Sequence, residues 1–337
     1  MNTSSSQFSQ GSNSTAKQIK QDNPLTPERE MVRALRRPWY ERAGRGAQVV
    51  WHESTKNKKV AIGLIIVLFF ILVAAFGPLF VHTDPNLLSM DAQAAPSAAH
   101  PLGTTALGQD IFKQLVVGTR SSIFWGFLTG IAVTIISILV GLVGGYFGGA
   151  VDEFLSLLTN VFLVLPALPL AIVLASYFPR GPQTVAAVII VTSWSWGARV
   201  LRAQTLSMRS REFVSSAKSN GETIWRIIFF EIFPNEISIV AANFVSTTLY
   251  VILASASLEF LGLGDPNGIS WGAMFYWAQK DNALISGLWW WFVPPGICIA
   301  VLGAGLSLIN FGIDEIADPR LRQEKIPKLV REKKVIA

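Results

Sequence analysis

Long apolar runs separated by short polar stretches dominate the chain from about residue 60 onwards. The first run is long enough to cross the ~30 Å hydrocarbon core of a bilayer as a helix rising about 1.5 Å per residue. Several later runs contain glycine or proline, which membrane helices tolerate when neighbours satisfy the freed carbonyl groups. The predicted spans are residues 60–81, about 121–146, about 154–178, about 184–200, about 237–258 and about 285–313. The pattern therefore predicts an all-α integral membrane protein with six transmembrane helices.

Polar segments flank this apolar region at both ends. Residues 1–24 are rich in Ser, Gln and Asn, so burial cannot offset their ordering entropy and disorder is predicted. Residues 26–59 are basic and contain three large aromatic residues, a composition that fits an interfacial helix and a solvated tail equally well. The expected domains are a cytoplasmic N-terminal tail 1–59, a six-helix membrane domain 60–315 and a basic cytoplasmic C-terminal tail 316–337.

Basic residues gather on one side of the predicted spans. Of the 28 Lys and Arg residues, 11 precede the first span, 6 lie at or between the fourth and fifth spans, and 7 follow residue 311. Cytoplasmic loops carry the excess of Lys and Arg, so both termini and the loop 201–235 are predicted to be cytoplasmic. Binding of anionic lipid by these clusters is compatible with the same topology. The predicted outer loops are residues 83–119 and 259–284.

Composition excludes several classes of function. The chain is 51% hydrophobic and 15% charged, whereas soluble domains are about one quarter charged. Its pI of about 9.5 would suit a nucleic-acid partner, but the basic residues lie beside the apolar spans, which argues against nucleic acid. The single cysteine, Cys298, makes neither an intrachain disulfide nor a zinc cluster.

No catalytic or cofactor-binding pattern is recognisable. The sequence has no phosphate-binding loop of the Gly-x-x-x-x-Gly-Lys-Ser/Thr type, and its histidines, His52, His82 and His100, are not paired at metal-ligand spacing. We therefore predict that the chain is not an enzyme and holds no metal or cofactor. The spans are also nearly free of ionisable residues, which disfavours an ion-driven carrier and predicts that energy arrives from another protein.

The loop at 201–235 carries the most informative pattern. Its sequence predicts two short helices, the first ending at Asn220-Gly221, where glycine fits a left-handed backbone, and the second ending at Pro234. The first helix is expected to present Phe213, Ala217 and Asn220 on one face, with charged residues beside them. Such a helix can dock into a groove of a soluble partner or lie on the membrane surface, and the pattern alone leaves both interpretations open.

This loop resembles the "EAA" coupling motif of importer-type ABC permeases, in the form found in the dipeptide/oligopeptide branch of the peptide/nickel permease family. The matching positions are Glu212, Val214, Ala217, Gly221, Pro234 and Asn235. Further family-like motifs occur in the family's order at residues 100–110, 118–122, 144–152, 257–274 and 318–322, ending in Asp-Pro-Arg-Leu-Arg. Each motif is weak evidence by itself, but the ordered set is specific.

The resemblance implies a type I importer permease in the bacterial cytoplasmic membrane, forming half of a translocation pathway for di- or oligopeptides. The implied partners are a second homologous permease, two ABC ATPase subunits or domains that bind ATP and Mg²⁺, an extracytoplasmic solute-binding protein and the lipid bilayer. The residues expected to couple the chain to the ATPase are Glu212, Val214, Ser215, Ser216, Ala217, Gly221, Pro234 and Asn235. Nickel chelates or other small solutes are the alternative cargo, and a stand-alone membrane scaffold or carrier is the alternative class.

The sequence departs from the family pattern at five positions. Ser215 and Ser216 stand where the motif often has an acid or alanine followed by alanine, and Asn220 stands where an apolar residue is common. The side chains at 215 and 216 remain small, so docking is expected to survive. In the first outer loop, Thr105 and Gln109 replace an expected acidic and an expected basic residue.

Glycines and tryptophans in the spans have plain structural interpretations. Small-x-x-x-small spacing at Gly126 and Gly130, and in the pairs formed by residues 144, 145, 148 and 149, predicts close helix approach. The three consecutive tryptophans at 289–291 are predicted to lie at the outer membrane interface.

Overall fold

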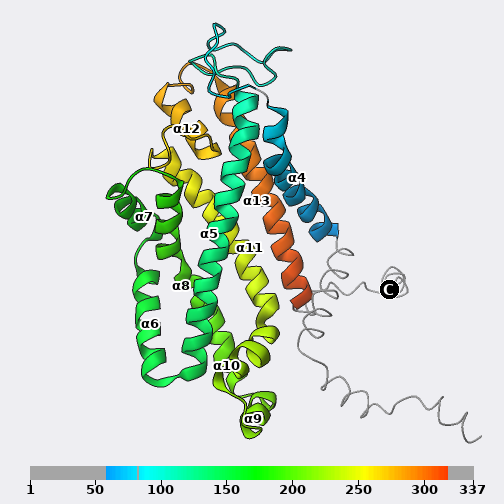
Figure 1. Ribbon diagram of the computed structural model, residues 1–337, viewed down its shortest axis with the longest axis vertical. Helices are drawn as coiled ribbons and strands as arrows, with labels where there is room; N and C mark the ends of the chain where they lie inside the picture. The colour runs from blue at the N-terminus through cyan, green and yellow to red at the C-terminus, as the bar shows by residue number, and fades with distance from the viewer. Residues whose placement is uncertain (1–57, 82, 318–337) are drawn as a thin grey trace, which may run out of the picture. The chain divides into compact units, whose positions relative to one another are not determined.

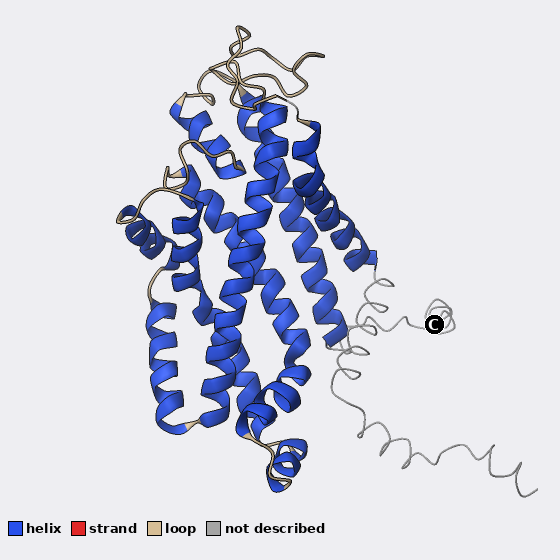
Figure 2. Ribbon diagram, in the orientation of Figure 1, coloured by secondary structure: helices blue, strands red, loops and turns tan. Residues whose placement is uncertain are grey.

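The structure, a computed structural model, describes residues 58–81 and 83–317, and these form helices joined by loops without a named strand (Figures 1 and 2). The predictions for the N-terminal tail and for the motif at 318–322 fall outside these residues. The helices, including one π-helical segment η1, are α4 (Lys58–Phe80), α5 (Ile111–Phe147), α6 (Gly149–Val164), α7 (Ala167–Ser176), α8 (Pro182–Arg209), α9 (Glu212–Ser219), α10 (Ile224–Arg226), η1 (Ile227–Ile232), α11 (Phe233–Phe260), α12 (Trp271–Lys280) and α13 (Trp289–Ala317).

Five stretches of helix are long and apolar enough to cross a membrane, and the bent pair α6–α7 makes a sixth if it counts as one span. Large apolar side chains such as Ile65, Phe69 and Leu157 are exposed on the outside of this bundle. A water-soluble protein would bury such residues, so the surface matches lipid as the surrounding medium. The predicted all-α membrane fold is confirmed.

The expected third span is not one straight helix. It is divided into α6 and α7, whose axes differ by 88°. Leu165 and Pro166, which join them, have extended backbones. A proline disfavours helical geometry at the residue before it, which accounts for the break at this point in the span.

Other boundaries lie beyond the predicted ones. Helix α5 begins at Ile111, ten residues before the predicted second span, because the Asp110 side chain caps its N-terminus by accepting a hydrogen bond from the Lys113 N–H at 3.1 Å. Helix α8 continues to Arg209. The predicted outer loop 83–119 and coupling loop 201–235 therefore contain helical turns at their edges, which apolarity alone did not reveal.

Pro234 does not end a helix, contrary to the prediction. The stretch from Ile224 to Phe260 runs as one candidate span through the π-helical segment η1. The Phe233 N–H donates to the carbonyl of Ile228, five residues earlier. This wider turn leaves Pro234 in the first turn of α11, where its missing N–H and its ring are tolerated.

Helix α5 packs against α4, α8 and α11. Some of its glycines lie at these helix contacts, and others form the turn that follows the helix. A Cβ on Gly126 would lie 2.6 Å from Ile252, and one on Gly145 would lie 2.7 Å from Thr205, so these glycines allow α11 and α8 to approach as predicted. Gly148 and Gly149 differ from the prediction: both have positive φ angles and form the turn between α5 and α6.

Candidate coupling site and outer cavity

Helix α9 is held against the bundle by its apolar residues. Val214 is fully buried and Ala217 nearly so, in a cluster with Leu142 of α5 and with Ile227 and Ile228 of η1. Phe213 is only partly buried and Asn220 is exposed, so the expected face of Phe213, Ala217 and Asn220 is shifted by one residue. Val214 and Ala217 thus fix the position of α9 rather than offer a contact surface.

The end of α9 is a glycine cap, as predicted. Gly221 has a φ of +76°. The Gly221 N–H donates to the Lys218 carbonyl at 3.0 Å and the Glu222 N–H donates to the Ala217 carbonyl at 3.2 Å, which together form a Schellman motif. The Lys218 ammonium lies 5.2 Å from the centroid of the Tyr146 ring, a second link between α9 and α5.

The remaining coupling candidates divide into two groups. Glu212, Ser215, Ser216 and Gly221 are exposed around α9, which projects from one end of the bundle (Figure 1). Pro234 and Asn235 lie apart from this exposed face, in the first turn of α11. The Asn235 side-chain amide donates to the Glu231 carbonyl at 2.6 Å and so braces the transition from η1 to α11.

An ion pair joins α6 to α8 near the same end. The Arg202 guanidinium donates from Nε and Nη2 to the two carboxylate oxygens of Asp152, the second at 2.7 Å. Both side chains are mostly buried. Such a two-pronged pair combines charge with fixed geometry, so it holds α6 in one orientation on α8.

Replacing Asp152 with alanine is expected to lower the stability of the purified protein by about 1–3 kcal/mol, because Arg202 then keeps a half-buried charge without its partner. Thermal unfolding in detergent measures the change as a lowered apparent Tm. Glu153→Ala is the matched control, since it removes a carboxylate one residue away that does not take part in this pair. Equal losses in the two variants would contradict a structural role for the ion pair.

Glu236 is a buried carboxyl group that sequence reasoning missed. It lies in α11 with no exposed surface, and its Oε1 accepts a hydrogen bond from the Thr205 hydroxyl of α8 at 2.9 Å. Oε2 has no partner among the described residues. The predicted fifth span began at residue 237, which excluded Glu236 by one position. Glu236 is thus one of the few ionisable residues in spans that are otherwise nearly free of them, as predicted.

At the opposite end, two sequence motifs meet. The Ser270 hydroxyl caps α12 by accepting from the Ala273 N–H and donates to the Glu259 carboxylate. The Trp271 N–H donates to the Ser122 hydroxyl of α5 at 3.1 Å. A side chain on Gly272 would collide with Glu259. The motifs at 118–122 and 257–274 thus form one joint between α5, α11 and α12.

The loop at residues 83–110 is tied to the start of α5 and to α13. His100 Nδ1 lies 2.9 Å from Asp110 Oδ2, so the loop is linked to the cap of α5. Trp290 Nε1 donates to the Thr104 carbonyl at 3.4 Å. No group of three potential metal ligands occurs within residues 58–81 and 83–317.

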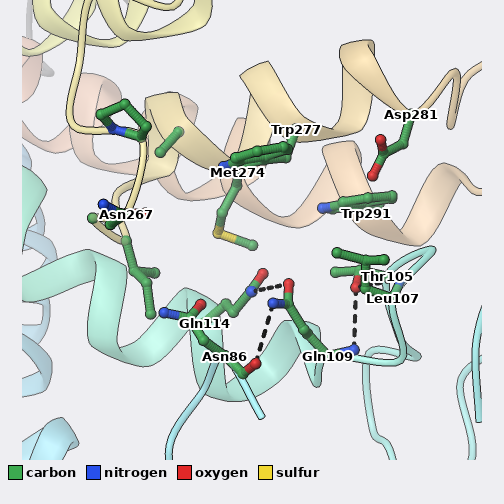
Figure 3. Close-up of a pocket in the computed structure, with 14 residues that line it drawn as sticks. Asn86, Thr105, Leu107, Gln109, Gln114, Asn267, Met274, Trp277, Asp281 and Trp291 are labelled. Carbon is green, nitrogen blue, oxygen red and sulfur yellow. Dashed lines mark hydrogen bonds between the residues drawn. The ribbon is translucent and has the colours of Figure 1, made fainter. Parts of the chain in front are cut away.

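A cavity of about 270 Å³ opens between this loop, the start of α5 and α12 (Figure 3). Gln114 of α5 donates to the Gln109 side-chain oxygen at 2.9 Å, and Gln109 donates to the Asn86 carbonyl at 3.3 Å. These amides form one wall, facing Met274 and Trp277 of α12. Two of the positions that depart from the family pattern, Thr105 and Gln109, line this cavity.

Only part of the tryptophan cluster lies at the surface. Trp289 is exposed, whereas Trp291 is almost fully buried and lines the cavity. The indole Nε1 of Trp291 has no hydrogen-bond partner among the described residues. Packing against α12 therefore overrides the interfacial preference of tryptophan at this position.

Comparison with known proteins fits this arrangement. The family model "Binding-protein-dependent transport system inner membrane component" matches residues 137–323, more than half of the chain, and "N-terminal TM domain of oligopeptide transport permease C" matches residues 47–101. The oligopeptide transport system permease protein OppC of Bacillus subtilis is 34% identical over 272 residues, which cover 79% of this chain and 87% of that protein. The dipeptide transport system permease protein DppC of the same species is 31% identical over 280 residues, covering 82% and 86%.

A solved structure of the MetNI methionine ABC transporter in inward-facing conformations matches with a TM-score of 0.50 at 17% identity, covering 62% of this chain and 97% of that one. At this identity the likeness concerns the fold alone. The fold is that of a type I ABC importer permease. The chain belongs to the family of binding-protein-dependent transport system inner membrane components, and the predicted resemblance is confirmed. It is accordingly a membrane permease subunit.

Proposed function

We propose that this chain forms half of a translocation pathway for di- or oligopeptides and that α9 transmits the motion of a separate ATPase to the spans. The observation that carries the proposal is the way α9 packs against the bundle. Val214 and Ala217 bury one side of it in the bundle, while Glu212, Ser215 and Ser216 remain exposed at the tip. A short helix that is fixed on one side and exposed on the other suits docking in the groove of a soluble partner.

The alternative for α9, a helix lying on the membrane surface, is disfavoured by the same contacts. A surface helix turns its apolar side toward lipid, but Val214 and Ala217 face the chain's own α5 and η1. The outer side of α9 carries polar residues, Ser215 and Ser216 among them. We therefore assign this end of the bundle to the cytoplasm, in agreement with the basic residues of the loop.

Peptides are the cargo that the relatives support. The proteins similar over most of this chain are named as oligopeptide and dipeptide permeases, and we infer the same class of solute here. The partners in this proposal are a second homologous permease, two ABC ATPase subunits or domains that bind ATP and Mg²⁺, and an extracytoplasmic solute-binding protein. The exposed apolar surface of the bundle leaves room for both lipid and the second permease.

Purification of the tagged protein from its native membranes in mild detergent is expected to recover a second permease and an ABC ATPase, identified by mass spectrometry. A cysteine at Ser216 should then cross-link to the ATPase, because the side chain at this position is exposed on α9. Ser286→Cys is the matched control, an exposed serine at the opposite end of the bundle. Recovery of the protein alone, or cross-linking of both cysteines to the ATPase, would contradict the proposal.

A further inference from the structure

The cavity at the outer end is slightly smaller than a typical small-molecule pocket and has room for one long side chain. Its volume of about 270 Å³ lies below the roughly 300–1,000 Å³ of pockets that enclose small-molecule ligands. The wall is already ordered, because the hydrogen bonds from Gln114 to Gln109 and from Gln109 to Asn86 fix the amides in place. An occupant therefore meets a preformed site.

Charge around the cavity favours a cation. Two segments connect helices at this end, residues 83–110 and 261–288. Their charged residues are five aspartates and one lysine. The lysine, Lys280, lies 4.3 Å from the centroid of the Trp277 ring. Asp281 lines the cavity and is only partly exposed. The nearest other cations along the chain, Lys113 and Arg180, do not line it.

The remaining walls suit the stem of a long basic side chain. Met274 and Trp277 of α12 and the Trp291 ring of α13 supply apolar surface beside the amides (Figure 3). Arginine combines an apolar stem, a planar cation that stacks on aromatic rings and five hydrogen-bond donors. The Trp291 indole N–H is a donor and cannot accept a hydrogen bond from a guanidinium, so Trp291 contributes only the surface of its ring.

We propose that this cavity receives one arginine side chain from the solute-binding protein, with Asp281 as its charge partner. This inference rests on the proposed function, because that function places the cavity on the side from which a binding protein delivers solute. The amide wall and Asp281 offer acceptors to the guanidinium, and the acidic surface around them attracts a basic docking face.

Asp281→Asn tests the proposal, since it removes the charge and keeps the size of the side chain. The affinity of the solute-binding protein for the complete transporter in nanodiscs is measured at low and high ionic strength. We expect Asp281→Asn to raise the Kd about five- to tenfold at low ionic strength and to reduce its salt dependence. Asp91→Asn, a 69% exposed acid that does not line the cavity, should change the Kd by less than about twofold.

Asn267→Trp is a second variant that fills the mouth of the cavity from an exposed position, and it should abolish docking where Ser286→Trp does not. The rate of basal ATP hydrolysis should be unchanged in all four variants. An unchanged rate shows that the complexes are intact. Normal affinity in both Asp281→Asn and Asn267→Trp would overturn the inference. A variant that keeps the Kd for the binding protein but raises the KM for the peptide would also overturn the inference, because the cavity would then bind the solute. Failure of the unmodified transporter to bind any solute-binding protein would instead overturn the proposed function.

Discussion

Gly221→Val is expected to uncouple ATP hydrolysis from transport. Gly221 has a φ of +76°, and a Cβ added there would meet nothing within 4 Å, so the penalty comes from the backbone and not from a collision. A left-handed conformation costs a residue with a Cβ roughly 1–2 kcal/mol, and β-branched residues tolerate it least. Relief of that strain opens the Schellman cap and displaces the end of α9. Peptide uptake should fall about tenfold or more, while ATP hydrolysis persists, because about 1.4 kcal/mol corresponds to a factor of ten.

Two control variants distinguish a specific loss of coupling at Gly221 from the general effect of backbone strain. Gly287 has a φ of +75° and equally open surroundings, but it lies in the turn before α13 at the other end of the bundle. Gly287→Val introduces the same backbone strain and should leave the ratio of transport to ATP hydrolysis unchanged. Gly221→Asn should retain coupling, since asparagine tolerates the left-handed region. Reconstituted transporter, assayed for both activities, provides the measurement, and normal uptake by Gly221→Val would refute the role of α9.

Gly145→Ala is expected to destabilise the contact between α5 and α8. The added methyl group would lie 2.7 Å from the Thr205 side chain and 2.9 Å from the Arg202 carbonyl. Backbone cannot move aside as a flexible side chain does, so the two helices must separate. Overpacking of this kind costs about 1–3 kcal/mol. The displacement also disturbs the Thr205–Glu236 hydrogen bond.

Gly144→Ala is the matched control because the nearest atom to its added methyl group is 3.5 Å away, an ordinary contact distance. Alanine is a better helix former than glycine by about 1 kcal/mol, so this variant should be neutral or more stable. The apparent Tm in detergent and the yield of assembled complex distinguish the two. Similar behaviour of both variants would show that helix propensity, and not the approach of α8, determines the outcome at residue 145.

The Thr205–Glu236 and Arg202–Asp152 contacts suggest how motion at α9 reaches the spans. Both involve α8, and they connect it to α11 and α6. The π-helical segment η1 joins α9's buried face to α11 without an intervening loop. In the proposed function, a displacement of α9 would pass to α11 through packed side chains and continuous helix rather than through a flexible connection.

The apolar pattern by itself determined the class of the protein, because a helix that crosses a bilayer needs a long run without charges whatever its neighbours are. The helix in the loop at 201–235 was recognisable for a similar reason. Asn220-Gly221 ends α9 through a local backbone conformation, and such a preference is encoded in adjacent residues. The short helix and its glycine cap were therefore predicted correctly, but the face of Phe213, Ala217 and Asn220 was not, because Val214 and Ala217 are the residues buried against the bundle.

Only the tertiary structure decided features that depend on distant residues. Pro166 breaks a span whereas Pro234 does not, because the wide turn of η1 accommodates the second proline. The pairing of Arg202 with Asp152 and of Thr205 with Glu236 joins helices that the sequence does not order in space. The walls of the cavity come from a loop, α5, α12 and α13, so no local sequence pattern predicts it. Hydrophobicity acts on each segment separately, whereas these contacts exist only once the segments have packed together.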